Sequence, residues 1–235
     1  MPWYQKKIIS GKIIEIYRYF SVRKTGKKYL PRTINRNTTP EEKQVINDRE
    51  ARLKCARILN TNFSKDDVFV RLSYRKKPTS ESQAIQDNRN FRRRLSYFIK
   101  KNDLPELKFM TVTEKGTGRV HHHWVMNFKD LSALISIWGL GGVYCVPLWS
   151  EDFTNLANYI TKETIRNEHG KRWSQSRNLK QPEIKVVELK KESQTFPKTP
   201  KGYTLIECTC YTTELGHKTW YTKNVENGAE YLETG

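Results

Sequence analysis

The sequence predicts an α+β fold in which a central antiparallel β-sheet of about five strands is flanked by α-helices. Residues 107–113 alternate apolar and polar side chains, as a strand with one buried face does, and residues 67–74 repeat this pattern. Helices are predicted at residues 39–60, which open with a capping box, and at residues 80–101, where apolar side chains recur at three- and four-residue spacing. Shorter elements are expected as strands at residues 8–20, 143–148, 184–189 and 203–211 and as helices at residues 131–137 and 150–163, with a loose tail from Asn224.

Composition points to a polyanionic partner. The chain has 235 residues, and its 43 Lys and Arg outnumber its 25 Asp and Glu, which gives a net charge of +18. A charge of this size favours nucleic acid, although a generally basic protein or one that touches anionic membranes is the alternative. No apolar run approaches the roughly 20 residues needed to cross a bilayer, so we expect no membrane partner.

Three segments are expected along the chain. Residues 1–64 form a basic N-terminal extension of strands, arm and helix, residues 65–192 form the core, and residues 193–235 form a C-terminal β extension that packs on the core. The first 40 residues hold ten Lys or Arg against one acid, a net of +9. This segment either follows a phosphate backbone, with its aromatic residues stacking on bases, or is a solvated basic edge.

The four cysteines indicate a cytoplasmic protein with reduced thiols. They are scattered, without a Cys-x-x-Cys pair, which argues against a disulfide framework. Cys208 and Cys210 are two residues apart on a predicted strand and therefore share a face, where we expect them to be buried core thiols.

Residues 114–126 carry the densest cluster of chemically active side chains. Gly116 and Gly118 predict a tight turn between the strand at 107–113 and a return strand, so the unit reads as a β-hairpin. Because side chains alternate along a strand, His121 and His123 share one face, and Glu114 reaches the same face across the turn.

Two imidazoles and a carboxylate on one surface suit a divalent metal with open coordination positions. The alternative is that consecutive histidines are a surface accident, and single histidines on strands are usually ordinary polar residues. Three of the five histidines of the chain cluster here beside a Glu, which favours the metal interpretation.

The segment at residues 118–126, Gly-Arg-Val-His-His-His-Trp-Val-Met, resembles the histidine–hydrophobe–histidine strand of HUH endonucleases. More narrowly, it resembles rolling-circle replication initiators of small single-stranded DNA phages and plasmids. His122 departs from the family because it stands where a hydrophobic residue is usual. The similarity continues in the Ser-Arg-Asn-Leu segment at residues 176–179 and covers about residues 65–182.

Tyr159 and Lys162 lie three residues apart on the predicted helix 150–163, for which Ser150 is the expected cap. A Tyr-x-x-Lys pair alone is a weak signal, since such pairs are usually surface residues. About 36 residues after the histidine strand, however, it matches the third motif of the family. Asn155 occupies the place of the second tyrosine, so the chain resembles the single-tyrosine type.

The resemblance implies an HUH/Rep-type sheet, a variant of the ferredoxin-like arrangement, and a nickase that forms a 5′-phosphotyrosine intermediate to initiate rolling-circle replication. Tyr159 and Lys162 would be catalytic, and Glu114, His121 and His123 would bind Mn²⁺ or Mg²⁺. Single-stranded DNA or an origin hairpin, a host helicase and a polymerase would be partners inside a bacterial cell, and a homo-oligomer is compatible with one tyrosine. The residues expected to bind DNA are Arg71, Arg119, Asn155, Asn158, Arg166, Arg172, Trp173 and Arg177.

Two other hypotheses of function remain open. A single-tyrosine HUH transposase or a relaxase would share the chemistry, although relaxases usually place the tyrosine ahead of the histidines. A non-catalytic basic DNA-binding module with a structural metal belongs to a different class. A closed four-ligand site would favour that module, whereas three ligands favour an open, catalytic site.

Overall fold

The chain divides into two compact units in the computed structural model, one formed by Met1–Thr61 with Gln181–Gly235 and the other by Asn62–Lys180. Each unit contains an antiparallel sheet and at least one helix, in agreement with the predicted α+β class, although there are two sheets instead of one. The structure describes residues 3–21, 39–78, 80–115, 119–162, 164–165, 170–191, 194–212 and 218–231.

The sheet of the first unit joins the two ends of the chain. Its strand order is β10-β11-β2-β1-β9, and every neighbouring pair is antiparallel. Gly11, at the turn between the first two strands, has a φ of +57°, and a Cβ there would lie 2.0 Å from the backbone oxygen of Asn60. Only glycine fits such a turn without strain. The strands are β1 (Trp3–Ser10), β2 (Ile13–Phe20), β9 (Glu183–Leu189), β10 (Tyr203–Thr212) and β11 (Lys218–Glu226).

The long helix of this unit, α1 (Pro40–Asn62), begins as predicted. The Thr39 N–H donates to Glu42, and the Glu42 N–H donates to the Thr39 hydroxyl at 3.2 Å, which is a capping box. Near its other end, Arg57 donates two hydrogen bonds to the buried carboxylate of Glu15 on β2. This ion pair fixes the helix against the sheet.

The second unit has the strand order β6-β3-β5-β4-β7, and β8 pairs separately with β4. The predicted hairpin is present as β4 and β5, while the expected turn at Gly116 and Gly118 lies outside the described residues. The strands are β3 (Val68–Ser73), β4 (Phe109–Lys115), β5 (Val120–Met126), β6 (Val143–Pro147), β7 (Thr164–Ile165) and β8 (Ser174–Gln175).

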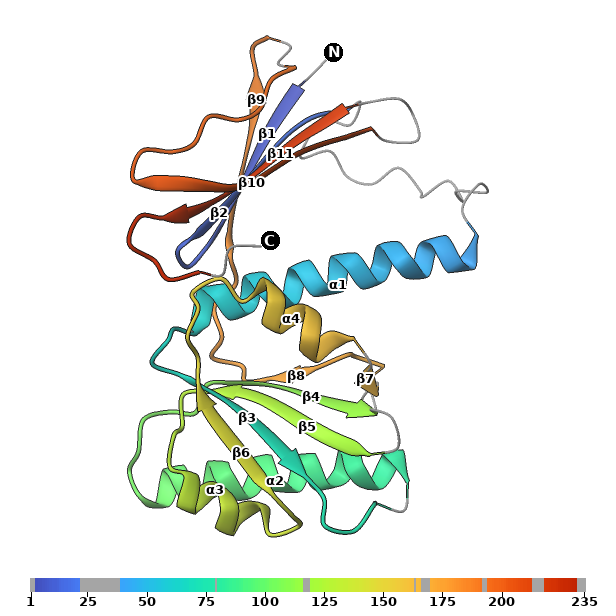
Figure 1. The fold of residues 1–235 in the computed structure, drawn as a ribbon, viewed down its shortest axis with the longest axis vertical. Coiled ribbons are helices and arrows are strands. Elements are labelled where there is room, and N and C mark those ends of the chain that lie inside the picture. Colours follow the sequence, from blue (N-terminus) through green and yellow to red (C-terminus); the bar gives the residue numbers. More distant parts are fainter. Residues whose placement is uncertain are drawn as a thin grey trace. The chain divides into compact units, whose positions relative to one another are not determined.

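Helices cover both faces of this sheet (Figure 1). The helices α2 (Glu81–Lys101) and α3 (Leu131–Trp138) lie on one side, and α4 (Thr154–Thr161) lies on the other. The core of the unit is on the α2 and α3 side, where Trp124 and Trp138 are fully buried among aliphatic side chains and Phe91. The opposite face carries α4 and holds the candidate site.

Several local predictions need correction. The segment from Asn224 is not a loose tail, since β11 continues to Glu226 and Asn224 is fully buried. Cys208 and Cys210 are exposed and not core thiols, and neither face of β10 is buried in a core. A separate finding concerns membranes: no helix in the described part of the chain is both long and apolar enough to span one.

Candidate active site

Strand register places three of the predicted residues on one face of the second sheet. Glu114 on β4 pairs directly with His121 on β5, and paired residues project their side chains to the same side. His123 follows two residues later and shares that face. The centres of the His121 and His123 rings are 6.5 Å apart.

Burial keeps both imidazoles of this face in the form that binds metals. Loss of solvent lowers the pKa of His121 and of His123, and the nearby Arg71 guanidinium lowers both further, against the opposing effect of Glu114. His123 is almost fully buried, and its Nε2 donates to the Glu114 carboxylate in a short contact. Its Nδ1 is buried without a hydrogen-bond partner among the described residues.

Tyr159 lies over the imidazole of His123. The centre of its ring is 5.3 Å from that of His123, at an interplanar angle of 69°, and the side chain is 50% exposed. Phe69 on β3 stacks on His123 at 5.4 Å and meets the edge of Tyr159 at 6.3 Å. A solvent-accessible phenol therefore stands beside the histidine and carboxylate cluster.

The helix that carries Tyr159 begins later than predicted. We expected Ser150 to cap it, but the Ser150 hydroxyl donates to the Asp152 backbone oxygen, and Asp152 accepts from the backbone N–H and the hydroxyl of Thr154. The helix therefore starts at Thr154, with its buried stripe at Ala157 and Ile160. This stripe turns Tyr159 outward. Lys162 follows at the C-terminal end as an exposed residue.

The third histidine of the strand has a supporting role. His122 is fully buried on the opposite face, between the Thr113 hydroxyl at 3.0 Å and the Tyr74 hydroxyl at 2.8 Å. Because Tyr74 donates onward to Asp87, the His122 Nε2–H donates to Tyr74 and its Nδ1 accepts from Thr113. Burial, with smaller effects of the two neighbouring histidines, lowers the pKa of His122 to about 3. This neutral ring ties β5 to its neighbours from behind the site.

The donor set suits a divalent cation in its chemistry. Two neutral imidazoles and one carboxylate are oxygen and nitrogen ligands that Mn²⁺ accepts, and the buried Nδ1 of His123 is a polar atom still without a partner in the described residues. No group of three or more His, Cys, Asp or Glu side chains within the described ranges is already arranged to hold an ion. The features that favour a metal are therefore the types of these three side chains and the face of the sheet that they share.

The residues expected to bind DNA fall into two groups. Arg71 and Arg119 are exposed near His121, close enough to lower its pKa, and Asn155 and Asn158 are exposed on α4. A second group lies along the edge of β4 and near α2, away from the histidine pair: Arg172, Trp173 and Arg177. Arg166 lies outside the described residues.

Two residues of the site were missed from the sequence. Phe69 contacts both His123 and Tyr159, and the ring of Tyr144 lies 5.4 Å from the Arg71 guanidinium in a cation–π contact. The available signal was alternation, since Phe69 precedes Arg71 by two residues and so shares its face. The pairing of β6 with β3, which brings Tyr144 opposite Arg71, could not be predicted from local pattern.

The sequence matches one protein family. Residues 67–165 match the family model of the replication-associated protein ORF2/G2P. The matched segment runs from β3 to β7 and so contains the histidine strand and Tyr159. This match supports a Rep-type replication initiator. Comparison with curated proteins and with solved structures finds no match.

Proposed function

We propose that the protein is a single-tyrosine HUH endonuclease that nicks and rejoins single-stranded DNA to start rolling-circle replication. The observation that carries this proposal is the position of the half-exposed Tyr159 ring, 5.3 Å from His123 on the face that also holds His121 and Glu114. A nucleophile beside a set of metal-ligand side chains is what phosphoryl transfer to a tyrosine requires. The family match supports the role in replication.

In the proposed reaction, the Tyr159 phenol oxygen attacks the scissile phosphorus. A bond forms between the phenol oxygen and phosphorus as the bond from phosphorus to the 3′ oxygen breaks, in line with the attack. The phenol gives its proton to water, and the departing oxygen takes one from Lys162 and becomes a free 3′-hydroxyl. This hydroxyl can prime a polymerase, and its attack on the phosphotyrosine reverses the step and joins the strand.

Glu114, His121 and His123 would hold a divalent ion, Mn²⁺ or Mg²⁺. When bound, such an ion supplies electrostatic stabilisation for the charge that develops on the phosphate oxygens. Phe69 packs against both rings and would keep the phenol in place for attack. Lys162 would bring a positive charge to the departing oxygen and supply its proton.

The exposed residues around the site would bind the strand. Arg71 and Arg119 supply positive charge beside His121, and the Arg71–Tyr144 pair offers a guanidinium and an aromatic face for stacking on a base. Only a single strand lets the backbone bend so that one phosphate enters a site on the surface of a sheet. A host helicase would therefore expose the origin, with an origin hairpin or a single strand as substrate.

The test is the formation of a covalent protein–DNA adduct. The full chain is incubated with a single-stranded oligonucleotide that carries a candidate origin, with Mn²⁺ or Mg²⁺, and is then run on a denaturing gel. We expect a band of higher mass that disappears in Tyr159→Phe. Tyr97→Phe is the matched control, because Tyr97 is 67% exposed on α2 and outside the site.

The histidines are tested by separating binding from cleavage. His121→Ala is expected to abolish the adduct and to leave DNA affinity within about twofold. The affinity changes little because a neutral imidazole makes no ionic contact with phosphates. Equal loss of binding and cleavage would mean that the histidines are structural. A protein that binds DNA but forms no adduct with any divalent metal would be a binding module, the second candidate.

A further inference from the structure

A basic cavity lies on the other side of the same sheet, between α2 and the segment around β8. It has a volume of about 70 Å³, and Arg89, Arg92 and Arg172 contribute to its lining. None of the described residues that line it is Asp or Glu. These three arginines come from two segments about 80 residues apart, and a lining of this kind suits an anion, because arginine offers forked donors that match phosphate oxygens.

The floor of this cavity is rigid and polar. Asn88 donates to the Thr111 hydroxyl at 3.2 Å and accepts from the Trp124 indole at 2.9 Å, so its amide is fixed. The hydroxyl of Thr113, beside it, bonds to the buried His122. Side chains already held by such bonds lose little freedom when a ligand arrives, so the cavity is preorganised.

One wall of the cavity is aromatic. Trp173 lines it, and its indole N–H donates to Gln175 at 2.9 Å, which fixes the orientation of the ring. Ser174 completes this wall on β8, where it pairs with Thr111. An aromatic ring beside a cluster of guanidiniums is the combination that single-stranded nucleic acids use, since one binds phosphates and the other stacks on bases.

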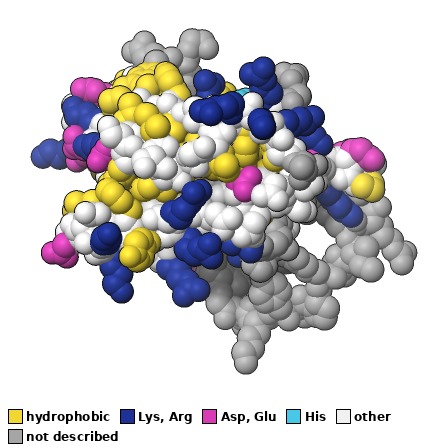
Figure 2. Space-filling model, turned by 90° about the horizontal axis from the view of Figure 1, so that it is seen from below, with side chains coloured by type: hydrophobic (Ala, Val, Ile, Leu, Met, Phe, Trp, Pro, Cys, Tyr) yellow, Lys and Arg dark blue, Asp and Glu magenta, His cyan; other side chains and the backbone are white. Residues whose placement is uncertain are grey.

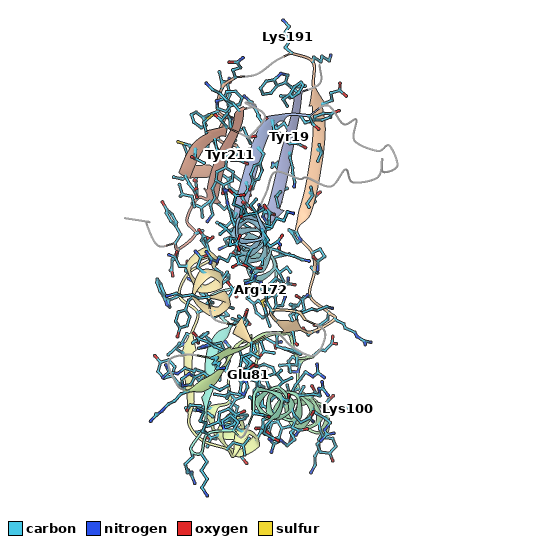
Figure 3. The ribbon with its side chains drawn as sticks, turned by 90° about the vertical axis from the view of Figure 1, so that its right-hand side faces the viewer. Tyr19, Glu81, Lys100, Arg172, Lys191 and Tyr211 are labelled. Atoms are coloured by element: carbon cyan, nitrogen blue, oxygen red, sulfur yellow. The ribbon has the colours of Figure 1, made fainter. Side chains whose placement is uncertain are left out.

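The basic lining continues along α2. Arg92 also lines a second hollow of about 680 Å³, whose lining includes Lys100 and Arg177 as well as Asp103 and Glu106. At about 1.5 Å per residue, Arg89 and Lys100 lie roughly 16 Å apart along the helix. That length is about five stacked nucleotides at 3.4 Å each. Figure 3 labels Arg172 and Lys100, and Figure 2 shows Lys and Arg side chains spread over the face seen from below.

We propose that the two hollows form one groove, named here the α2 groove, that binds the sugar–phosphate backbone of a single DNA strand. It lies on the opposite side of the sheet from Tyr159 and would hold a part of the same strand that is not being cut. This inference rests on the proposed function for the identity of the ligand. A single strand fits better than a duplex, because the small cavity admits one phosphate group and the Trp173 wall needs an unpaired base.

The test measures binding without cleavage, in the full chain with Tyr159→Phe. A fluorescent single strand of about 20 nucleotides, longer than the roughly five that the groove spans, is titrated by anisotropy at several salt concentrations. We expect the double substitution Arg92→Gln with Arg172→Gln to weaken binding about tenfold. It should also lower the slope of log affinity against log salt by about 1.4, because two phosphate contacts are lost.

Arg94→Gln is the matched control, since Arg94 is an exposed arginine of α2 that lines neither hollow. Equal losses in the control and the double variant would overturn the groove. A duplex of the same sequence that binds as tightly, with the same loss, would overturn the single-strand assignment. Displacement of the strand by inorganic phosphate, beyond the effect of chloride at equal ionic strength, would assign the cavity to free phosphate instead.

Thermal unfolding followed by circular dichroism shows whether the double variant keeps its fold. Binding and adduct formation are separate readouts, so the two proposals fail separately. A protein that never forms an adduct but shows the expected binding loss keeps the groove and loses the nickase. A protein that forms the Tyr159 adduct while the double variant binds normally keeps the nickase and loses the groove.

Discussion

The Tyr159 ring meets the His123 ring edge-on, with their centres 5.3 Å apart, although the two residues belong to different elements, α4 and β5. His123 is placed by the register of β5, and Tyr159 is turned outward by the buried stripe of α4. The contact therefore depends on how α4 packs on the sheet. Phe69 is the side chain that touches both rings, which makes it the first residue to test.

Phe69→Ala is expected to slow adduct formation about 100-fold, because a misplacement of about 1 Å in a nucleophile can cost that much. Affinity for single-stranded DNA should change little, since Phe69 is partly buried under Tyr159 and carries no charge. The measurement is single-turnover adduct formation at saturating DNA. Phe69→Tyr keeps the ring and should restore most of the rate, while Val146→Ala, opposite Phe69 on β6, is the control. A proportional loss of affinity in Phe69→Ala would contradict a positioning role.

The first unit offers a stability prediction at the Arg57–Glu15 ion pair. Arg57 donates to Glu15 and to the Tyr17 hydroxyl, and Tyr221 also donates to Glu15. Arg57→Leu leaves a buried carboxylate without its counter-ion, which costs about 3–5 kcal/mol of unfolding free energy. Urea unfolding followed by circular dichroism measures the loss.

Two further variants show whether the charge pair is responsible. Arg52→Leu replaces an exposed arginine of the same helix and should change the unfolding free energy by less than about 0.5 kcal/mol. The pair Glu15→Leu with Arg57→Leu removes both charges and should lose less than Arg57→Leu alone. If the double variant lost the sum of both single effects, the ion pair would not be coupled.

The elements predicted correctly are those that depend on residues close together in the sequence. The capping box at Thr39, the helix predicted at residues 80–101 and the β4–β5 hairpin all depend on short-range pattern, and all three are present. The common face of Glu114, His121 and His123 follows from the same alternation. The prediction that Ser150 caps the next helix was wrong: α4 begins only at Thr154, whose backbone N–H and hydroxyl donate to Asp152.

What the sequence did not predict depends on contacts between distant segments. Strand β11 pairs with β2 so that Thr222 stands opposite Ile16, more than 200 residues away, and no local pattern specifies that partner. Alternation placed Cys208 and Cys210 on one face, but it could not show that this face of β10 is left exposed. Local pattern also could not predict that Arg172 and Trp173 lie on the opposite side of the sheet from Tyr159, because this depends on how distant segments pack.

The cysteines predict a graded pattern of thiol labelling. Burial raises the pKa of Cys55 to about 12 and also raises that of Cys145, so their reactive thiolate fractions fall, whereas Cys208 and Cys210 are exposed. With iodoacetamide at about pH 8, we expect Cys208 and Cys210 to react first and Cys55 only after unfolding in urea. Peptide mapping by mass spectrometry assigns the sites. Rapid native labelling of Cys55 would show that α1 does not stay packed on its sheet.

Gly141, in the second unit, lies so close to neighbouring backbone atoms that no side chain fits there. A Cβ there would lie 2.2 Å from the Ser73 oxygen and 2.6 Å from the Arg75 nitrogen, both backbone atoms at the end of β3. The same Ser73 oxygen accepts a hydrogen bond from Trp138 at 2.8 Å, so it cannot move away freely. Gly141→Ala should therefore destabilise the unit by about 2–3 kcal/mol, as overpacking of a well-filled site does.

Gly142→Ala is the matched comparison one residue away. Its Cβ would meet the Ser73 hydroxyl at 2.9 Å, a side-chain atom that can rotate aside, so the expected loss is below about 1 kcal/mol. Thermal unfolding of the two variants measures the difference. Because Ser73 pairs with His121 across β3 and β5, the shift that Gly141→Ala forces should also slow adduct formation, while Gly142→Ala leaves it near wild type. Equal stability of the two variants would mean that this end of β3 yields more easily than its backbone contacts indicate.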